Sequence, residues 1–231
     1  MRLLHAIWAD MRFQLKQGFY LVYVLITIMY LIILSFLPKD LLSVGLPLVV
    51  FSDPSVLGLF FIGGIIMLEK MQGVLSVLVV SPLRTIEYIL SKLISLALVS
   101  VLAAFAITGF SHYCGSISWV LVFFSTVLTS GIFTLCGIMI TAGCNTVNQY
   151  MIKTIPYMLL FVLPCFSLIG FPYSWLFTLI PSVAALRLML GAYLGIPFYE
   201  AIGLIVYLIG MNYLFLRWTI RVFENKIIYQ D

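Results

Sequence analysis

Long blocks of apolar residues follow one another along the chain, separated by short stretches that carry charges, prolines or glycines. Residues 19–37 include no charged side chain over 19 positions. A helix rises about 1.5 Å per residue, so a block of this kind covers roughly the 30 Å hydrocarbon core of a membrane. The pattern predicts six membrane-spanning helices, at residues 19–37, 54–68, 86–110, 117–141, 151–171 and 198–218.

The first 17 residues show a different pattern, because their apolar residues recur at helical spacing. Leu4, Trp8, Met11 and Leu15 fall on one stripe, while the charged residues lie mostly elsewhere. We expect an amphipathic helix here that lies on the membrane surface. Its apolar side would sit among the lipid headgroups and its basic side would face the cytoplasm.

The composition agrees with a membrane protein. Of the 231 residues, 64% are hydrophobic and 9% are charged, against about 25% charged in ordinary soluble proteins. We therefore predict an all-α integral membrane protein with one domain, residues 1–231. The net charge of +4 has a simpler source than nucleic-acid binding, because Lys and Arg mark the cytoplasmic side of a membrane protein. With six spans and both termini in the cytoplasm, ten of the 12 Lys and Arg residues lie inside, which predicts a multi-pass protein of the cell membrane.

The stretch between the second and third predicted spans carries the clearest functional signal. Gly73 is a typical helix end, and Ser81-Pro82 is a typical break before a new helix. The apolar run between them predicts a short helix across the cytoplasmic membrane face, within a coupling segment at residues 69–84. Such a helix can carry a force from another protein into two spans. The residues assigned to this role are Glu69, Lys70, Gly73, Leu75, Leu78, Ser81, Pro82, Leu83, Arg84, Glu87 and Lys92.

Asp53 is the ionisable residue most deeply placed by this pattern. Asp followed by Pro54 is typical of a helix start, with the carboxylate capping free amides. The span at residues 54–68 would be about 22 Å long, too short to cross alone. Asp53 would then lie within the outer half of the membrane, at the end of a re-entrant or broken segment. Two interpretations stay open, a helix cap and a contact to substrate or proton.

The later spans carry prolines and small residues. Thr126, Ser130 and Thr134 recur at spacing four, which favours close helix packing over a polar transport path. Pro156 and Pro164 in the fifth span would kink it and free carbonyl groups, so they are candidates for the wall of a substrate path. Residues 173–197 are long for an outer loop yet apolar, and with Pro181 and Arg187 they predict a pair of short helices that dip into the outer leaflet.

Other classes of membrane protein fit the sequence less well. One His and one Cys, at positions 112 and 114, do not make a metal site. A motor-free secondary transporter normally has ionisable or unwound sites near the midplane of repeated halves, and only Asp53 qualifies here. An intramembrane enzyme needs a nucleophile with a base or a metal cluster in its spans. Both histidines fall outside the predicted spans, so we do not expect the chain to be catalytic by itself.

The order of these features resembles the type-two ABC transporter permeases. The resemblance rests on the amphipathic first helix, the Glu-x3-Gly-x7-Ser-Pro-Leu segment that begins at Glu69, and the Pro-x5-Arg stretch before the last span. Within that family, Ser-Pro-Leu-Arg-x2-Glu-Tyr-x3-Lys, residues 81–92, looks most like the small permeases of fluoroquinolone export. The B subunit of the haem exporter is the nearest alternative, and lipid or peptide permeases stay open.

The resemblance also implies partners and a mechanism. The sequence holds no G-x4-G-K-[ST] motif, so we expect no cofactor in this chain, with ATP and Mg bound by a separate ATP-binding subunit. That subunit would dock on the coupling segment, and a second permease chain would complete the transport path. The resemblance implies export of a small amphiphilic or hydrophobic substrate by alternating access. Glu69 would sit at the hinge, pairing with Lys70, Arg84 or Lys92 or contacting the motor.

Overall fold

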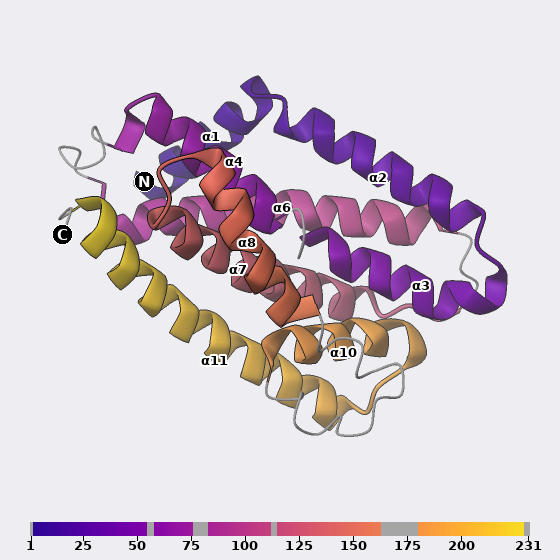
Figure 1. Ribbon diagram of the computed structural model, residues 1–231. Coiled ribbons are helices and arrows are strands. Elements are labelled where there is room, and N and C mark those ends of the chain that lie inside the picture. Colours follow the sequence, from indigo (N-terminus) through magenta and orange to yellow (C-terminus); the bar gives the residue numbers. More distant parts are fainter. Residues whose placement is uncertain (1, 55–57, 76–82, 112–114, 163–179, 229–231) are drawn as a thin grey trace.

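The computed structural model describes residues 2–54, 58–75, 83–111, 115–162 and 180–228. Every regular element in these residues is a helix. The predicted all-α membrane class is therefore confirmed. The α-helices are α1 Arg2–Lys16, α2 Phe19–Ser35, α3 Lys39–Ser52, α4 Gly58–Met71, α6 Thr85–Phe110, α7 Trp119–Ala142, α8 Val147–Val162, α10 Pro181–Leu194 and α11 Phe198–Phe223, and a π-helical turn, Glu224–Ile228, follows α11. α1 and the C-terminal end of α11 lie at the same end of the bundle (Figure 1).

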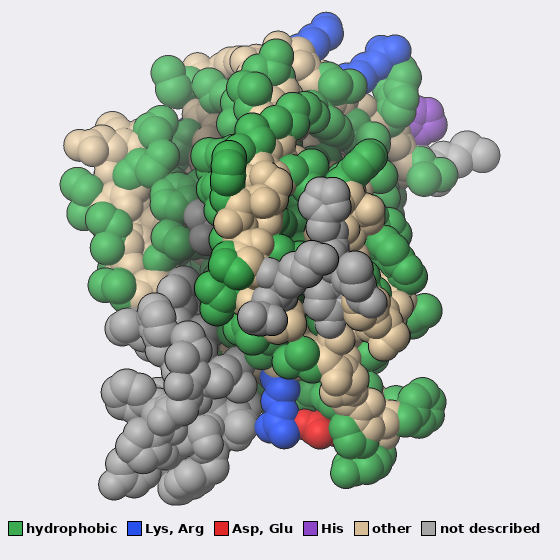
Figure 2. Space-filling model, turned by 90° about the vertical axis from the view of Figure 1, so that its right-hand side faces the viewer, with side chains coloured by type: hydrophobic (Ala, Val, Ile, Leu, Met, Phe, Trp, Pro, Cys, Tyr) green, Lys and Arg blue, Asp and Glu red, His purple; other side chains and the backbone are tan. Residues whose placement is uncertain are grey.

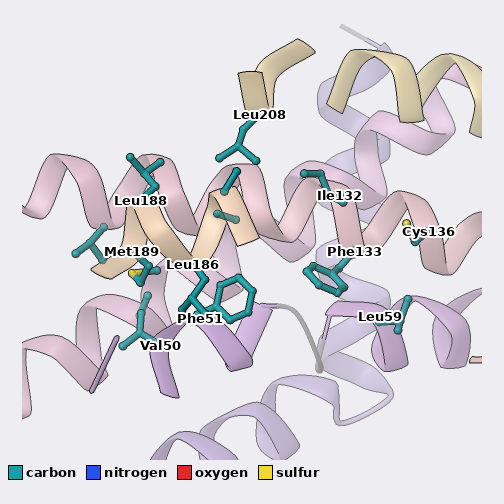
Figure 3. Close-up of a cluster of buried hydrophobic side chains, with 14 of the residues drawn as sticks. Val50, Phe51, Leu59, Ile132, Phe133, Cys136, Leu186, Leu188, Met189 and Leu208 are labelled. Carbon is teal, nitrogen blue, oxygen red and sulfur yellow. The ribbon is translucent and has the colours of Figure 1, made fainter. Parts of the chain in front are cut away.

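The central helix of the bundle is α7, which packs against α11, α6, α4 and α10. Most of its side chains are buried, in keeping with the small residues predicted to allow close packing. Thr126, Thr129 and Thr141 donate their hydroxyls to the carbonyl four residues earlier, so their polar atoms are satisfied within the helix. Figure 3 shows Ile132 and Phe133 of α7 among core side chains from α3, α10 and α11.

Two helices of the described residues, α6 and α7, and the continuous stretch Phe198–Lys226 are each long and apolar enough to cross a membrane. The bent pair α1 and α2 makes a fourth if it counts as one span. The six predicted spans are therefore not confirmed. The predicted fifth span is described only as far as Val162, and the description of the predicted second span is divided by residues 55–57, which lie outside it.

The position of Asp53 corrects one prediction. Asp53 does not start a helix at Pro54; it ends α3 with a right-handed helical backbone, and α4 is described from Gly58. α3 leads from the end of the bundle opposite the termini toward its middle, and α4 continues toward the termini (Figure 1). The stretch before Asp53 is helical, although it contains Gly45 and Pro47. Asp53 therefore stands at the end of α3, and residues 55–57, before α4, lie outside the described part.

The first helix and the outer segment agree with the sequence in their local structure. α1 is present and is bent by 69° from α2, so it lies across the bundle end instead of extending the span. Leu4, Trp8 and Leu15 of its apolar stripe are exposed and free to enter a lipid surface. α10 begins at Pro181, as expected for proline in a first helical turn, and is buried against α3, α7 and α11. The predicted partner helix of α10 falls on residues outside the described part.

Hydrophobic side chains cover most of the described surface at the end of the bundle away from the termini. Figure 2 shows this end, with Lys and Arg side chains visible only near its upper and lower edges. Arg187 of α10 pairs with Glu200 of α11 at 2.5 Å, and both side chains are partly exposed. Surface pairs of this kind contribute at most about 1 kcal/mol, so this one orients the α10–α11 corner without dominating its stability.

Candidate coupling site

A buried lysine connects three helices at the bundle end that carries the termini. Lys92, in the second turn of α6, is 0% exposed, and its ammonium group contacts a carboxylate oxygen of Asp10 in α1 and one of Glu69 in α4. An ammonium has three donors, so one lysine can bind both carboxylates. The sequence allowed three cationic partners for Glu69, and the structure selects Lys92.

The second oxygen of each carboxylate is also bonded. Tyr88 donates its hydroxyl to Glu69 Oε2 at 2.6 Å, and Ser91 donates to Asp10 Oδ2 at 2.5 Å. We name these five residues, Asp10, Glu69, Tyr88, Ser91 and Lys92, the Lys92 cluster. A buried polar network whose members are all bonded holds its helices in one arrangement, because any shift leaves a charge unpaired.

Local structure explains why Glu69 needs a cation. It lies in the last turn of α4, where the free carbonyl groups of a helix end already make the potential negative. It is also 4% exposed, so water cannot solvate its charge. Ser95 lies one turn after Lys92 in α6, and its Oγ accepts a hydrogen bond from Gln14 Nε2 at 2.8 Å. This bond extends the polar contact between α1 and α6. α1 is thus held against the bundle by its polar side.

A cavity of about 310 Å³ adjoins the cluster. Asp10, Glu69 and Tyr88 form part of its wall, together with Val74 and Leu83, which belong to the coupling segment. The cluster and the coupling segment therefore face the same space. A group that enters this cavity, or a shift of the segment beside it, acts directly on the contacts that join α1, α4 and α6.

The coupling segment agrees with the prediction as far as it is described. α4 ends at Met71, and Gly73 adopts a positive φ of 71°, a conformation that glycine accepts at no steric cost. Helical backbone resumes at Val74 and Leu75, and Leu75 is buried. Before α6, Arg84 is exposed and its backbone N–H donates to Glu87 Oε2 at 2.9 Å. Leu78, Ser81 and Pro82, like the rest of the predicted coupling helix, lie outside the described residues.

Lys70 does not join the Lys92 cluster. Its Nζ donates to the Cys144 carbonyl at 2.9 Å and to Asn145 Oδ1 at 3.2 Å, which connects the end of α4 to the turn between α7 and α8. The adjacent charges Glu69 and Lys70 thus point to different neighbours. One faces α1 and α6, and the other faces α7 and α8.

Replacing Lys70 by methionine is expected to change the free energy of unfolding by less than about 1.5 kcal/mol, because the carbonyl and amide it releases can bind water at the bundle end. Thermal unfolding of the purified chain in lipid nanodiscs measures the effect. A loss comparable to that of a buried ion pair would show that this end of α4 depends on Lys70 as much as on Glu69.

Sequence reasoning missed Asp10 and the two residues of α6 that bind the carboxylates, Tyr88 and Ser91. One signal was present: Asp10 and Gln14 stand four residues apart, so they share one face of the first helix. A lysine inside a predicted span also requires a carboxylate partner. The sequence pattern placed the apolar stripe of Leu4, Trp8 and Leu15 against the lipid headgroups. It did not identify the face with Asp10 and Gln14 as the one that packs against the bundle.

The other predicted residues do not join the coupling site. Asp53 is fully buried and accepts a hydrogen bond from the Tyr23 hydroxyl at 3.1 Å. Pro156 lies inside α8, and Pro164 is outside the described residues. Arg187 pairs with Glu200, as described above.

Comparison with known proteins identifies the family of this chain. Residues 1–229 match the fluoroquinolones export permease protein family. The chain is also 31% identical, over 114 residues, to fluoroquinolones export permease proteins from two strains of Mycobacterium tuberculosis, CDC 1551 / Oshkosh and H37Rv. These matches cover 49% of this chain, and the chain spans about half the length, 48%, of each of these relatives.

Proposed function

Because the chain belongs to the fluoroquinolones export permease protein family, we propose that it is the membrane subunit of an ABC-type exporter driven by a separate ATP-binding subunit. Its substrate would be a small amphiphilic or hydrophobic molecule, and the names of its relatives support drugs such as fluoroquinolones. The chain would act as a permease in the cell membrane with both termini in the cytoplasm. A second permease chain would complete the path.

The observation that carries this proposal is the Lys92 cluster beside the coupling segment. One ammonium group holds α1, the end of α4 and the start of α6 together, and the segment connects the last two of these helices. A motor subunit that pushes on residues 69–84 would therefore move three helices as one body. Movement of a rigid helix group between two arrangements is what alternating access requires.

In this mechanism the chain's own residues transmit the motion and its partner supplies the energy. Closure of the ATP-binding subunits would displace the coupling segment. Gly73, with its positive φ, provides a sharp turn between α4 and that segment, and the Lys92 cluster keeps α4 and α6 from separating. The displacement would then reach the membrane-spanning part of α6 and, through helix contacts, the central helix α7.

Co-purification tests the proposal. The tagged chain is isolated from its native membrane in mild detergent, and its companions are identified by mass spectrometry for four versions: wild type, Glu69→Ala, a replacement of residues 74–81 by a glycine-serine linker, and Glu200→Ala. Glu200 is the matched control, because its carboxylate pairs with Arg187 and not with the cluster.

We expect a protein with a Walker motif to accompany wild type and the Glu200 variant, to be lost when residues 74–81 are replaced, and to be reduced in Glu69→Ala. A wild-type chain that purifies without any ATP-binding protein would contradict the ABC proposal. It would instead favour a motor-free transporter.

A further inference from the structure

Asp53 has no cationic partner among the described residues. It is 0% exposed, and the ion pairs of the described part of the chain do not include it. The Tyr23 hydroxyl donates to Asp53 Oδ2 at 3.1 Å and lies 3.0 Å from Ser100 Oγ. Asp53 Oδ1 has no hydrogen-bond partner among the described residues, which leave out residues 55–57. An acid placed within a membrane bundle without its counter-charge is costly, and such residues mark functional sites.

Tyr23 also lines a cavity of about 360 Å³ between α2 and α6. The cavity wall is almost wholly apolar, with Val99 and Ala103 of α6 facing α2. Leu102 and Phe110, on the same wall, are largely exposed, so the cavity opens on the outer surface of the bundle. An opening on this apolar surface would let a molecule dissolved in the bilayer enter from the side.

A second tyrosine, Tyr20, adds a polar side chain to the wall of this apolar cavity. Tyr20 lies three residues before Tyr23, on the same side of α2, and both line the cavity. The Tyr20 hydroxyl is buried, and no hydrogen-bond partner for it is found in the part of the chain that the structure describes. Two aromatic rings, one unpartnered hydroxyl oxygen and a carboxyl group behind Tyr23 thus gather on one wall. Aromatic rings and carboxylates both attract cations, and a hydroxyl oxygen accepts a hydrogen bond from an ammonium group.

We propose that this cavity binds an amphiphile that carries a protonated amine, with the apolar body between α2 and α6 and the ammonium group at Tyr20 and Tyr23. When ionised, Asp53 attracts the ammonium group across Tyr23, because charges interact strongly across the poorly polarisable interior. A neutral lipid chain would fill the apolar part of the cavity and leave the Tyr20 hydroxyl without a partner. Identification of this amphiphile as a transported substrate rests on the proposed export function, whereas the binding itself does not.

Binding is tested with monodansylcadaverine, a primary amine joined to a fluorophore that brightens in apolar surroundings, and with its neutral N-acetyl derivative. Each is titrated into the purified chain in nanodiscs, and empty nanodiscs give the background. We expect wild type to prefer the amine by about tenfold. Asp53→Asn should bring this ratio close to one, and Glu200→Gln, a carboxylate neutralised outside the cavity, should leave it unchanged.

Ala106→Phe, which fills the cavity from α6, should weaken binding of both compounds and serves as a second test that does not depend on Asp53. Equal wild-type affinity for the two compounds would overturn the proposal and leave a groove for lipid. A preference for the amine that survives in a folded Asp53→Asn protein would overturn it as well. Because the assay needs no ATP-binding partner, its result is independent of the co-purification test.

Discussion

Lys92→Met is expected to lower the free energy of unfolding by about 3–5 kcal/mol, because it leaves the buried carboxylates of Asp10 and Glu69 without their cation. Methionine has nearly the same length as the lysine stem, so the loss reflects the charge and not a cavity. Thermal or denaturant unfolding of the chain in nanodiscs measures it. Lys70→Met is the matched control, since it removes a neighbouring ammonium group that bonds to the α7–α8 turn.

A variant in which the two carboxylates are neutralised together with Lys92 separates the effect on stability from the effect on coupling. The triple variant Asp10→Asn, Glu69→Gln, Lys92→Met is expected to recover most of the lost stability, because replacement of a whole buried ion cluster is often close to neutral. In complex with its ATP-binding subunit, this folded variant should show reduced transport per ATP hydrolysed. A triple variant as unstable as Lys92→Met would show that the unpaired carboxylate charges do not cause the loss.

The helices follow from local signals that a sequence displays directly. Apolar blocks gave the approximate positions of α2, α6, α7 and α11, and a proline or glycine marked several ends. Pro181 begins α10, and Gly73 and Gly195 adopt positive φ just after helices. The signal failed at Asp53, because the same Asp-Pro pair that often starts a helix can also follow one. A hydrogen bond from Tyr23 of α2, which itself contacts Ser100 of α6, joins Asp53 at the end of α3 to distant parts of the sequence.

The candidate site was predictable only in part, for a related reason. Glu69 and Lys92 are only 23 residues apart in the sequence, and both are charged residues next to apolar blocks. The sequence therefore predicted that they could pair. Asp10 is 82 residues from Lys92, and its role depends on which face of α1 meets the bundle. That choice depends on tertiary packing, which single-sequence patterns do not contain. The buried Tyr23 and Ser100 around Asp53 were hidden for the same reason, since each looks like an ordinary residue of an apolar span.

Gly63→Ala is expected to destabilise the chain by about 2–4 kcal/mol, through overpacking and loss of a buried hydrogen bond. A Cβ at Gly63 would lie 2.0 Å from Cε1 and 2.1 Å from Cζ of the Tyr150 ring. Tyr150 of α8 is 1% exposed, and its hydroxyl donates to the Leu59 carbonyl of α4 at 2.5 Å. Because these distances are far below a normal contact, the buried ring or one of the two helices must shift. Thermal unfolding in nanodiscs measures the loss.

Gly203→Ala is the matched control, because a Cβ at this helical glycine in α11 meets nothing within 4 Å. Alanine favours the helix over glycine, so the control should be neutral or stabilised by up to about 1 kcal/mol. Tyr150→Leu provides the second arm of a double-mutant cycle: in that background Gly63→Ala should cost much less, since the ring it meets is gone. An undiminished cost there would mean that Gly63 is required by the α4 backbone itself and not by its approach to Tyr150.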